Sequence, residues 1–122
     1  MTVKLTWYSH ACFLIDTGDE KLLTDPFLTG NPMAPVTADN VVADYILVSH
    51  GHGDHVGDTV AIAQRTGATV IANFEIQNWL AGQGVDNGHP QHIGGGFDYP
   101  WGRVKLTMAQ HGSALPDGSC LL

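Results

Sequence analysis

Three histidines and one aspartate occur within a stretch of six residues, at His50, His52, Asp54 and His55. Imidazole nitrogens and carboxylate oxygens are the donors that Zn²⁺ and similar divalent metals prefer. Glycines separate the first three of these residues, so the backbone can turn sharply and let neighbouring side chains converge. The spacing therefore predicts a metal-binding loop, with His50 and His52 directed at one metal and Asp54 and His55 at a second metal beside it.

The residues before this loop, 43–49, form an apolar run with β-branched side chains, which favours a buried strand. His111 also follows a predicted strand, residues 103–109, and alignment of the two strands would bring His111 to the edge where His50 lies. Three histidine ligands with one open position are typical of a catalytic zinc site, where the metal lowers the pKa of bound water toward about 7. Asp54 is a candidate catalytic residue that orients this water or takes its proton.

Two further residues are candidates for lining the site. Asp25 ends a predicted strand and can be a hydrogen-bond partner for a ligating imidazole. His10 lies between the first two predicted strands, where a purely structural loop histidine is the alternative interpretation. His89 and His92 are expected to be structural or surface residues.

The remaining patterns predict a mixed scaffold of strands and helices. Apolar runs between turn residues predict strands, and apolar residues at helical spacing predict helices. The predicted strands are 3–8, 11–16, 20–24, 43–49, 69–72 and 103–109, and the predicted helices are about 59–65 and 74–81. Short connections between the first three strands favour an antiparallel meander. Three prolines between residues 26 and 35 predict a stiff loop without regular structure.

The bulk composition limits the classes of function. A length of 122 residues is sufficient for one domain, and 43% hydrophobic with 14% charged residues argues against disorder. A formal charge of −7 argues against a nucleic-acid partner. The sequence shows neither an N-terminal signal peptide nor an apolar run that would span a membrane, so a cytoplasmic location is expected. Cys12 lies in an apolar run and is expected to be a buried free thiol.

The segment His50-Gly51-His52-Gly53-Asp54-His55 resembles the HxHxDH signature of the metallo-β-lactamase superfamily. Other segments resemble a bacterial and archaeal branch of metal-dependent hydrolases related to L-ascorbate-6-phosphate lactonases; they are residues 8–13, 25–32, 72–75, 92–96 and 111–113. The resemblance implies an αβ/βα sandwich of two similar halves with metals at one edge.

By position, the resemblance assigns His50, His52 and His111 to a first metal position, and Asp54 and His55 to a second metal position. It also raises the expectation that His10 lines the site. The metal is expected to be zinc, one or two ions, with manganese or iron tolerated by the same ligands.

The family also uses a later bridging aspartate and a last histidine, which this sequence does not supply. Asp117 is the one aspartate after His111, and it does not match the pattern. Residues 1–122 are therefore expected to form a single truncated domain of α/β (α+β) class: the N-terminal half of the sandwich, with a mixed β-sheet and helices on one face. The second metal position is expected to be incomplete, and an apolar surface to be exposed.

Two functions follow from these patterns. The first is a metal-dependent hydrolase in which activated water attacks an ester, lactone or phosphoester bond of a small molecule. It would need a complementary C-terminal half or a second copy in a homo-oligomer. The alternative is an inactive metal-binding half-domain that self-associates. A nuclease is a weaker third possibility, because the chain lacks a basic stripe.

Overall fold

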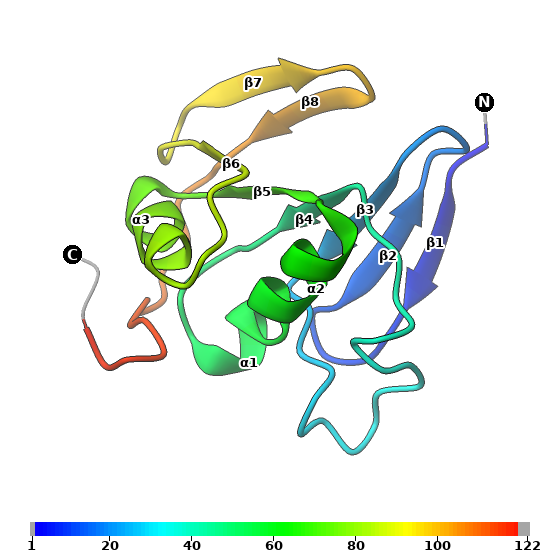
Figure 1. The fold of residues 1–122 in the computed structure, drawn as a ribbon. Coiled ribbons are helices and arrows are strands. Elements are labelled where there is room, and N and C mark those ends of the chain that lie inside the picture. Colours follow the sequence, from blue (N-terminus) through cyan, green and yellow to red (C-terminus); the bar gives the residue numbers. More distant parts are fainter. Residues whose placement is uncertain (1, 120–122) are drawn as a thin grey trace.

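The computed structural model describes residues 2–119, which form a six-stranded sheet, a two-stranded hairpin and helices (Figure 1). The strands of the sheet are β1 (Lys4–Trp7), β2 (Phe13–Asp16), β3 (Lys21–Thr24), β4 (Tyr45–Leu47), β5 (Thr69–Ala72) and β6 (Gly88–Pro90). The hairpin is β7 (Gly96–Tyr99) and β8 (Gly102–Lys105), and the helices are α1 (Gly53–Val56), α2 (Thr59–Thr66) and α3 (Phe74–Gly82).

The sheet follows chain order, β1-β2-β3-β4-β5-β6, and is mixed. Strands β1, β2 and β3 pair antiparallel, which confirms the predicted meander. Strands β3 to β6 pair in parallel, so β4 and β5 direct their C-terminal ends to one edge of the sheet. Because parallel strands carry functional loops at that edge, the topology places the segment after β4 where a site is expected. The predicted fold class is thus confirmed.

One face of the sheet is covered by helices. Leu23, Ile46 and Val70 are paired across neighbouring strands and are fully buried in a cluster that includes Ile62 of α2 and Ile76 of α3. Figure 1 shows the helices on this side of the sheet. The alternation of side chains along a strand leaves the next residue of each strand on the opposite face.

Both longer helices begin and end close to the predicted residues. The side chain of Asn73 accepts a hydrogen bond from the Ile76 amide and caps α3. Gly67 ends α2 in the left-handed conformation, at φ 74°. The carboxylate of Asp58 precedes α2 but accepts hydrogen bonds from the amides of Leu28 and Thr29 instead, and so ties the proline-rich loop to the helix.

The opposite face of the sheet is only partly covered. The β7–β8 hairpin lies over β4 and β6, because Tyr99 contacts both Tyr45 and His89 through its ring. Over β1 and β2 the face is open: Leu5 is 65% exposed and Trp7 is 62% exposed, beside a partly exposed Phe13. An exposed apolar surface, as expected for half of a sandwich, is present there.

The structure corrects the strand predicted before His111 and the loop predicted for the histidine motif. The strand predicted over 103–109 ends at Lys105 and pairs with β7 in a separate sheet. The Leu106 carbonyl accepts a hydrogen bond from the Gly94 amide, and the Leu106 amide donates to the Gly95 carbonyl, so Leu106 bonds to the loop before β7. The histidine loop is partly helical. The His52 carbonyl accepts hydrogen bonds from the amides of His55 and Val56, and His52 is the N-cap of α1. Asp54 and His55 therefore project from a helical turn.

Cys12 is fully buried, as predicted, whereas Cys120 lies outside the described residues. Burial, followed by the negative charges of Asp25 and Asp58, raises the pKa of the Cys12 thiol from 9.0 to about 12. Because the thiolate is the reactive form, we expect a Cys120→Ser chain to show no fast reaction with a thiol reagent at pH 8 until it is denatured. The raised pKa contributes stability that is complete below pH 9.0 and is lost as the pH rises toward about 12.

A rapid stoichiometric reaction of the native Cys120→Ser chain would contradict this burial.

Within the described residues, no helix is long and apolar enough to cross a bilayer.

Candidate metal centre

The side chains of His50, His52 and His111 converge at the C-terminal edge of β4. The ring centroid of His111 lies 4.8 Å from that of His50 and 5.0 Å from that of His52. One nitrogen from each ring lies within 4.8 Å of the others. His50 Nε2 and His52 Nδ1 are 3.2 Å apart, which is close to the roughly 3.3 Å between two ligands of one tetrahedral zinc.

A chain of hydrogen bonds determines the tautomer of His50. The hydroxyl of Ser49 donates to Asp25 Oδ2 at 2.5 Å, because an ionised carboxylate only accepts. The same hydroxyl is 2.9 Å from His50 Nδ1, so it accepts a hydrogen bond from that nitrogen. His50 Nε2 is then left without a proton and directs its lone pair toward His52. This arrangement fits a metal ligand.

Asp25 orients a second histidine in the same way. Its Oδ2 atom is 2.8 Å from His55 Nδ1, and its Oδ1 atom accepts the Ser49 amide at 2.7 Å. Asp25 is 5% exposed, so these partners replace water around its charge. Since the carboxylate requires a proton on His55 Nδ1, His55 Nε2 is free to bind a metal.

His10 and Asp54 meet on the outer side of the cluster. His10 Nε2 lies 3.2 Å from Asp54 Oδ2, and the ring of His10 lies 4.8 Å from that of His55. These three residues form one potential metal-binding group, and His50, His52 and His111 form another. The rings of His50 and His55 are 4.1 Å apart, so the two groups are adjacent.

The electrostatics favour the protonation states that metal binding requires. Partial burial, followed by the nearby imidazoles of His55 and His52, lowers the pKa of His50 below 6.5, against the opposing charge of Asp25. His50 is therefore neutral at pH 7. Desolvation acts to raise the pKa of Asp54, but its backbone hydrogen bond and the imidazoles of His55 and His10 together lower it. Asp54 is thus ionised at neutral pH.

Close backbone contacts bring His111 to the cluster. The Gly51 amide donates to the Ser113 hydroxyl at 2.8 Å. A Cβ atom on Gly51 would lie 2.7 Å from the Ala114 carbonyl oxygen, so a glycine is required for this approach. His111 therefore reaches His50 although the strand before it belongs to the separate hairpin.

All seven residues singled out in the sequence lie in or beside this cluster: His10, Asp25, His50, His52, Asp54, His55 and His111. Their role as ligands stays a prediction. Ser49 and Ser113 were not among the predicted site residues. Ser49 directly precedes His50 and Ser113 lies two residues after His111, which was the available signal. His89 packs against Phe97 of the hairpin, and Asp117 accepts hydrogen bonds from Ser119, so both serve other contacts.

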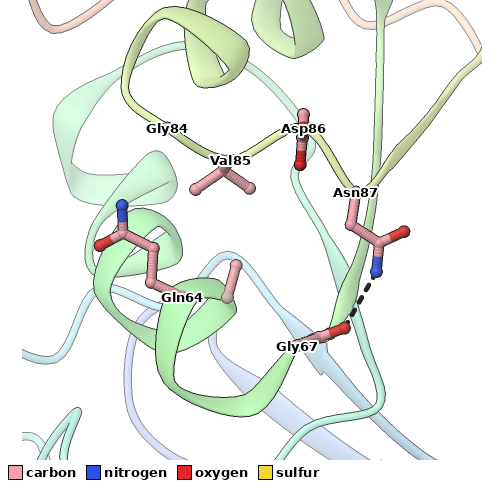
Figure 2. A pocket seen from close by; sticks show the side chains of 8 residues that line it. Gln64, Gly67, Gly84, Val85, Asp86 and Asn87 are labelled. Atoms are coloured by element: carbon pink, nitrogen blue, oxygen red, sulfur yellow. Dashed lines mark hydrogen bonds between the residues drawn. The ribbon is translucent and has the colours of Figure 1, made fainter.

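The pocket in Figure 2 lies elsewhere, between the end of α2 and the segment after α3. It has a volume of about 270 Å³ and its lining includes Gln64, Val85 and Asp86. The side chain of Asn87 donates a hydrogen bond to the Gly67 carbonyl, and both residues line the pocket. Histidines do not line this pocket, so it offers no comparable chemistry.

The family of the chain follows from comparison with known proteins. Residues 4–114 match the family model of the beta-lactamase superfamily domain. The chain belongs to the beta-lactamase superfamily. The structure of Igni18, titled a novel metallo hydrolase from Ignicoccus hospitalis, is similar to this superfamily member. The match covers 98% of this chain and 53% of the Igni18 chain, with a TM-score of 0.84 and 32% identity.

Curated relatives are more similar in sequence. A UPF0173 metal-dependent hydrolase from Carboxydothermus hydrogenoformans is 57% identical over 116 residues, which are 95% of this chain and 51% of the relative. One from Heliobacterium modesticaldum is 54% identical over 114 residues, which are 93% of this chain and 48% of the relative. The chain spans about half the length of the curated relatives it matches.

Replacement of Asp25 by asparagine tests the orienting role of its carboxylate in this superfamily member. The amide nitrogen of asparagine can only donate at one of the positions where both carboxylate oxygens now accept. If it faces His55 Nδ1, it favours the wrong tautomer of His55; if it faces Ser49, the Ser49 hydroxyl no longer holds the proton on His50 Nδ1. We expect the metal affinity to fall about 10- to 100-fold, measured by competition with a chromogenic chelator. Asp16→Asn, at a carboxylate that pairs with Lys21 on β3, is the control. Equal affinities in both variants would contradict the role.

Proposed function

We propose that this protein is part of a metal-dependent hydrolase that cleaves an ester, lactone or phosphoester bond in a small molecule by attack of activated water. The observation that carries the proposal is the 3.2 Å approach of His50 Nε2 to His52 Nδ1, with His111 closing the group. Ser49 holds the proton of His50 on Nδ1, so His50 Nε2 and His52 Nδ1 can both direct lone pairs at one shared cation.

A metal held by these three histidines supplies a Lewis acid that makes water nucleophilic at neutral pH. The chain's own residues do the rest. Asp25 and Ser49 hold the ligand tautomers and exclude rotation of the rings. Asp54 is ionised and 51% exposed in its side chain, so it can accept a proton from water at the site and pass it to solvent.

Zinc is the metal we propose, because three imidazoles with an open position are a catalytic zinc set. The same donors also accept manganese or iron. The charge of −7 supports a small-molecule substrate over a nucleic acid. A buried free thiol at Cys12 agrees with a reducing, cytoplasmic setting.

We further propose that residues 1–122 act as the N-terminal half of the domain and need a complementary half. The relatives are about twice as long as this chain. The open face over β1 and β2 presents Leu5, Trp7 and Phe13, the kind of apolar surface that a second layer covers. A second copy of the chain is an alternative cover. The competing function is an inactive metal-binding half-domain that self-associates.

Hydrolysis of a lactone, an aryl ester and a phosphodiester, each with Zn²⁺ present, tests the function. The chain is assayed alone and with a separately produced second half of the Carboxydothermus hydrogenoformans relative. We expect turnover of one substrate class with the second half added, and its loss in His50→Ala. Metal binding without turnover in either mixture would favour the inactive alternative, and a chain that binds no metal would refute both.

Analytical sedimentation of the chain alone tests whether a second copy covers the open face over β1 and β2. We expect self-association that weakens in Leu5→Lys and in Trp7→Lys, because burial of an unpaired lysine charge in the interface carries a large desolvation cost. Lys4→Glu, at the neighbouring exposed position of β1, is the control. A monodisperse monomer with cooperative unfolding would contradict self-association.

A further inference from the structure

We propose that His10 is a metal ligand, and that His10, Asp54 and His55 together complete the second metal position within this chain. The inference rests on the proposed function in assuming that the first metal position is occupied. It replaces the expectation that the second position needs a histidine from elsewhere.

The donor atoms already have suitable spacing. His10 Nε2 and Asp54 Oδ2 are 3.2 Å apart, close to the roughly 3.3 Å between two ligands of one tetrahedral metal. His55 offers a nitrogen within 4.8 Å of both atoms. Two imidazoles and one carboxylate are a common set for zinc and for other divalent metals.

The protons are placed to allow this binding. Asp25 requires a proton on His55 Nδ1, so His55 Nε2 carries a lone pair. The side chains of His10 and Asp54 are 42% and 51% exposed, which leaves room for an ion and for water to complete its shell. Binding would require His10 to carry its ring proton on Nδ1, so that Nε2 presents its lone pair to the ion in place of a hydrogen bond to Asp54.

The β1–β2 turn holds His10 in place. Ser9 and His10 adopt positive φ angles of 77° and 52°, which non-glycine residues rarely do. The indole nitrogen of Trp7 donates to the His10 carbonyl at 3.0 Å, and the ring of Phe27 meets the His10 ring edge-on. The backbone is thus fixed in the conformation that directs this imidazole at Asp54.

The location also suits a second ion. The ring of His55 is 4.1 Å from that of His50, so the second position directly adjoins the first. Two-metal hydrolytic sites hold their ions about 3.5–4 Å apart. The alternative is that His10 only donates a hydrogen bond that positions Asp54.

Titration of the purified chain with Co²⁺, followed by its d–d absorption, counts the metals and distinguishes these roles. We expect two equivalents in the native chain. His10→Gln keeps a hydrogen-bond donor for Asp54 but lacks an imidazole, so it should bind one equivalent tightly and the second at least ~100-fold more weakly, as should His10→Ala. His92→Ala, at an exposed histidine before the hairpin, should bind two equivalents.

Circular dichroism of each variant verifies that it is folded. Two tight equivalents in His10→Gln would overturn the inference, because a positioning role would be sufficient. One equivalent in the native chain that is unchanged in the His10 variants would overturn it as well and leave the proposed function standing. Failure of the native chain to bind any Co²⁺ would overturn both.

Discussion

Replacement of His52 by alanine is expected to abolish tight metal binding at the first metal position. His52 Nδ1 faces His50 Nε2 at 3.2 Å, and its ring contacts that of His111. Loss of a residue that only supports a ligand costs about 10- to 100-fold in affinity, so loss of a ligand should cost ~100-fold or more. Zinc content after dialysis and affinity from chelator competition measure the effect.

The matched control for this substitution is His92→Ala, which removes an exposed imidazole outside the cluster. It should keep the metal content and affinity of the native chain. If His52→Ala retained its zinc with native affinity, the three histidines would not be ligands of a common ion, and the assignment of the first metal position would fail.

Replacement of Gly57 by alanine is expected to destabilise the chain by about 3 kcal/mol or more, through overpacking and strained backbone. Gly57 has φ 47°, and a Cβ atom would lie 2.3 Å from the Pro26 carbonyl oxygen. The atoms that this Cβ would meet belong to the backbone of Pro26 and Phe27, so the loop that carries Asp25 must move. Because Asp25 orients His55, the substitution should weaken metal binding as well as lower the melting temperature by roughly 10 °C or more.

Gly82→Ala is the control for this effect. Gly82 ends α3, and a Cβ atom there would have no heavy atom within 4 Å. A helical Gly→Ala substitution should be neutral or stabilise the chain by up to about 1 kcal/mol. Thermal unfolding of both variants, followed by circular dichroism, measures the difference. Equal melting temperatures would show that the contact between α1 and the loop after β3 is not tight.

The identity and the surroundings of the histidine motif could be predicted from the sequence because they depend on local patterns. The apolar run before His50 predicts β4, and the helical spacing of Ile76 and Leu80 predicts α3. The meander follows from short connections between strand-forming runs. Each of these inferences uses residues that are neighbours in the chain.

The features that the sequence could not specify in detail depend on contacts between distant segments. The strand before His111 belongs to a separate hairpin, and His111 reaches the site through the contact of Gly51 with the segment around Ser113. Asp25 bridges Ser49 and His55, which are more than twenty residues away along the chain. Neither contact leaves a periodic pattern in the sequence. The convergence of His10 with Asp54 has the same cause, since it depends on the β1–β2 turn packing beside α1.

The most direct test of the metal centre is anomalous diffraction at the zinc edge from crystals of the chain grown with Zn²⁺. One peak should lie about 2.0–2.1 Å from His50 Nε2, His52 Nδ1 and a nitrogen of His111. A second peak should lie at the same range from His10, Asp54 and His55. Ordered density for these side chains without a peak among them, or with zinc bound only elsewhere on the surface, would contradict the account.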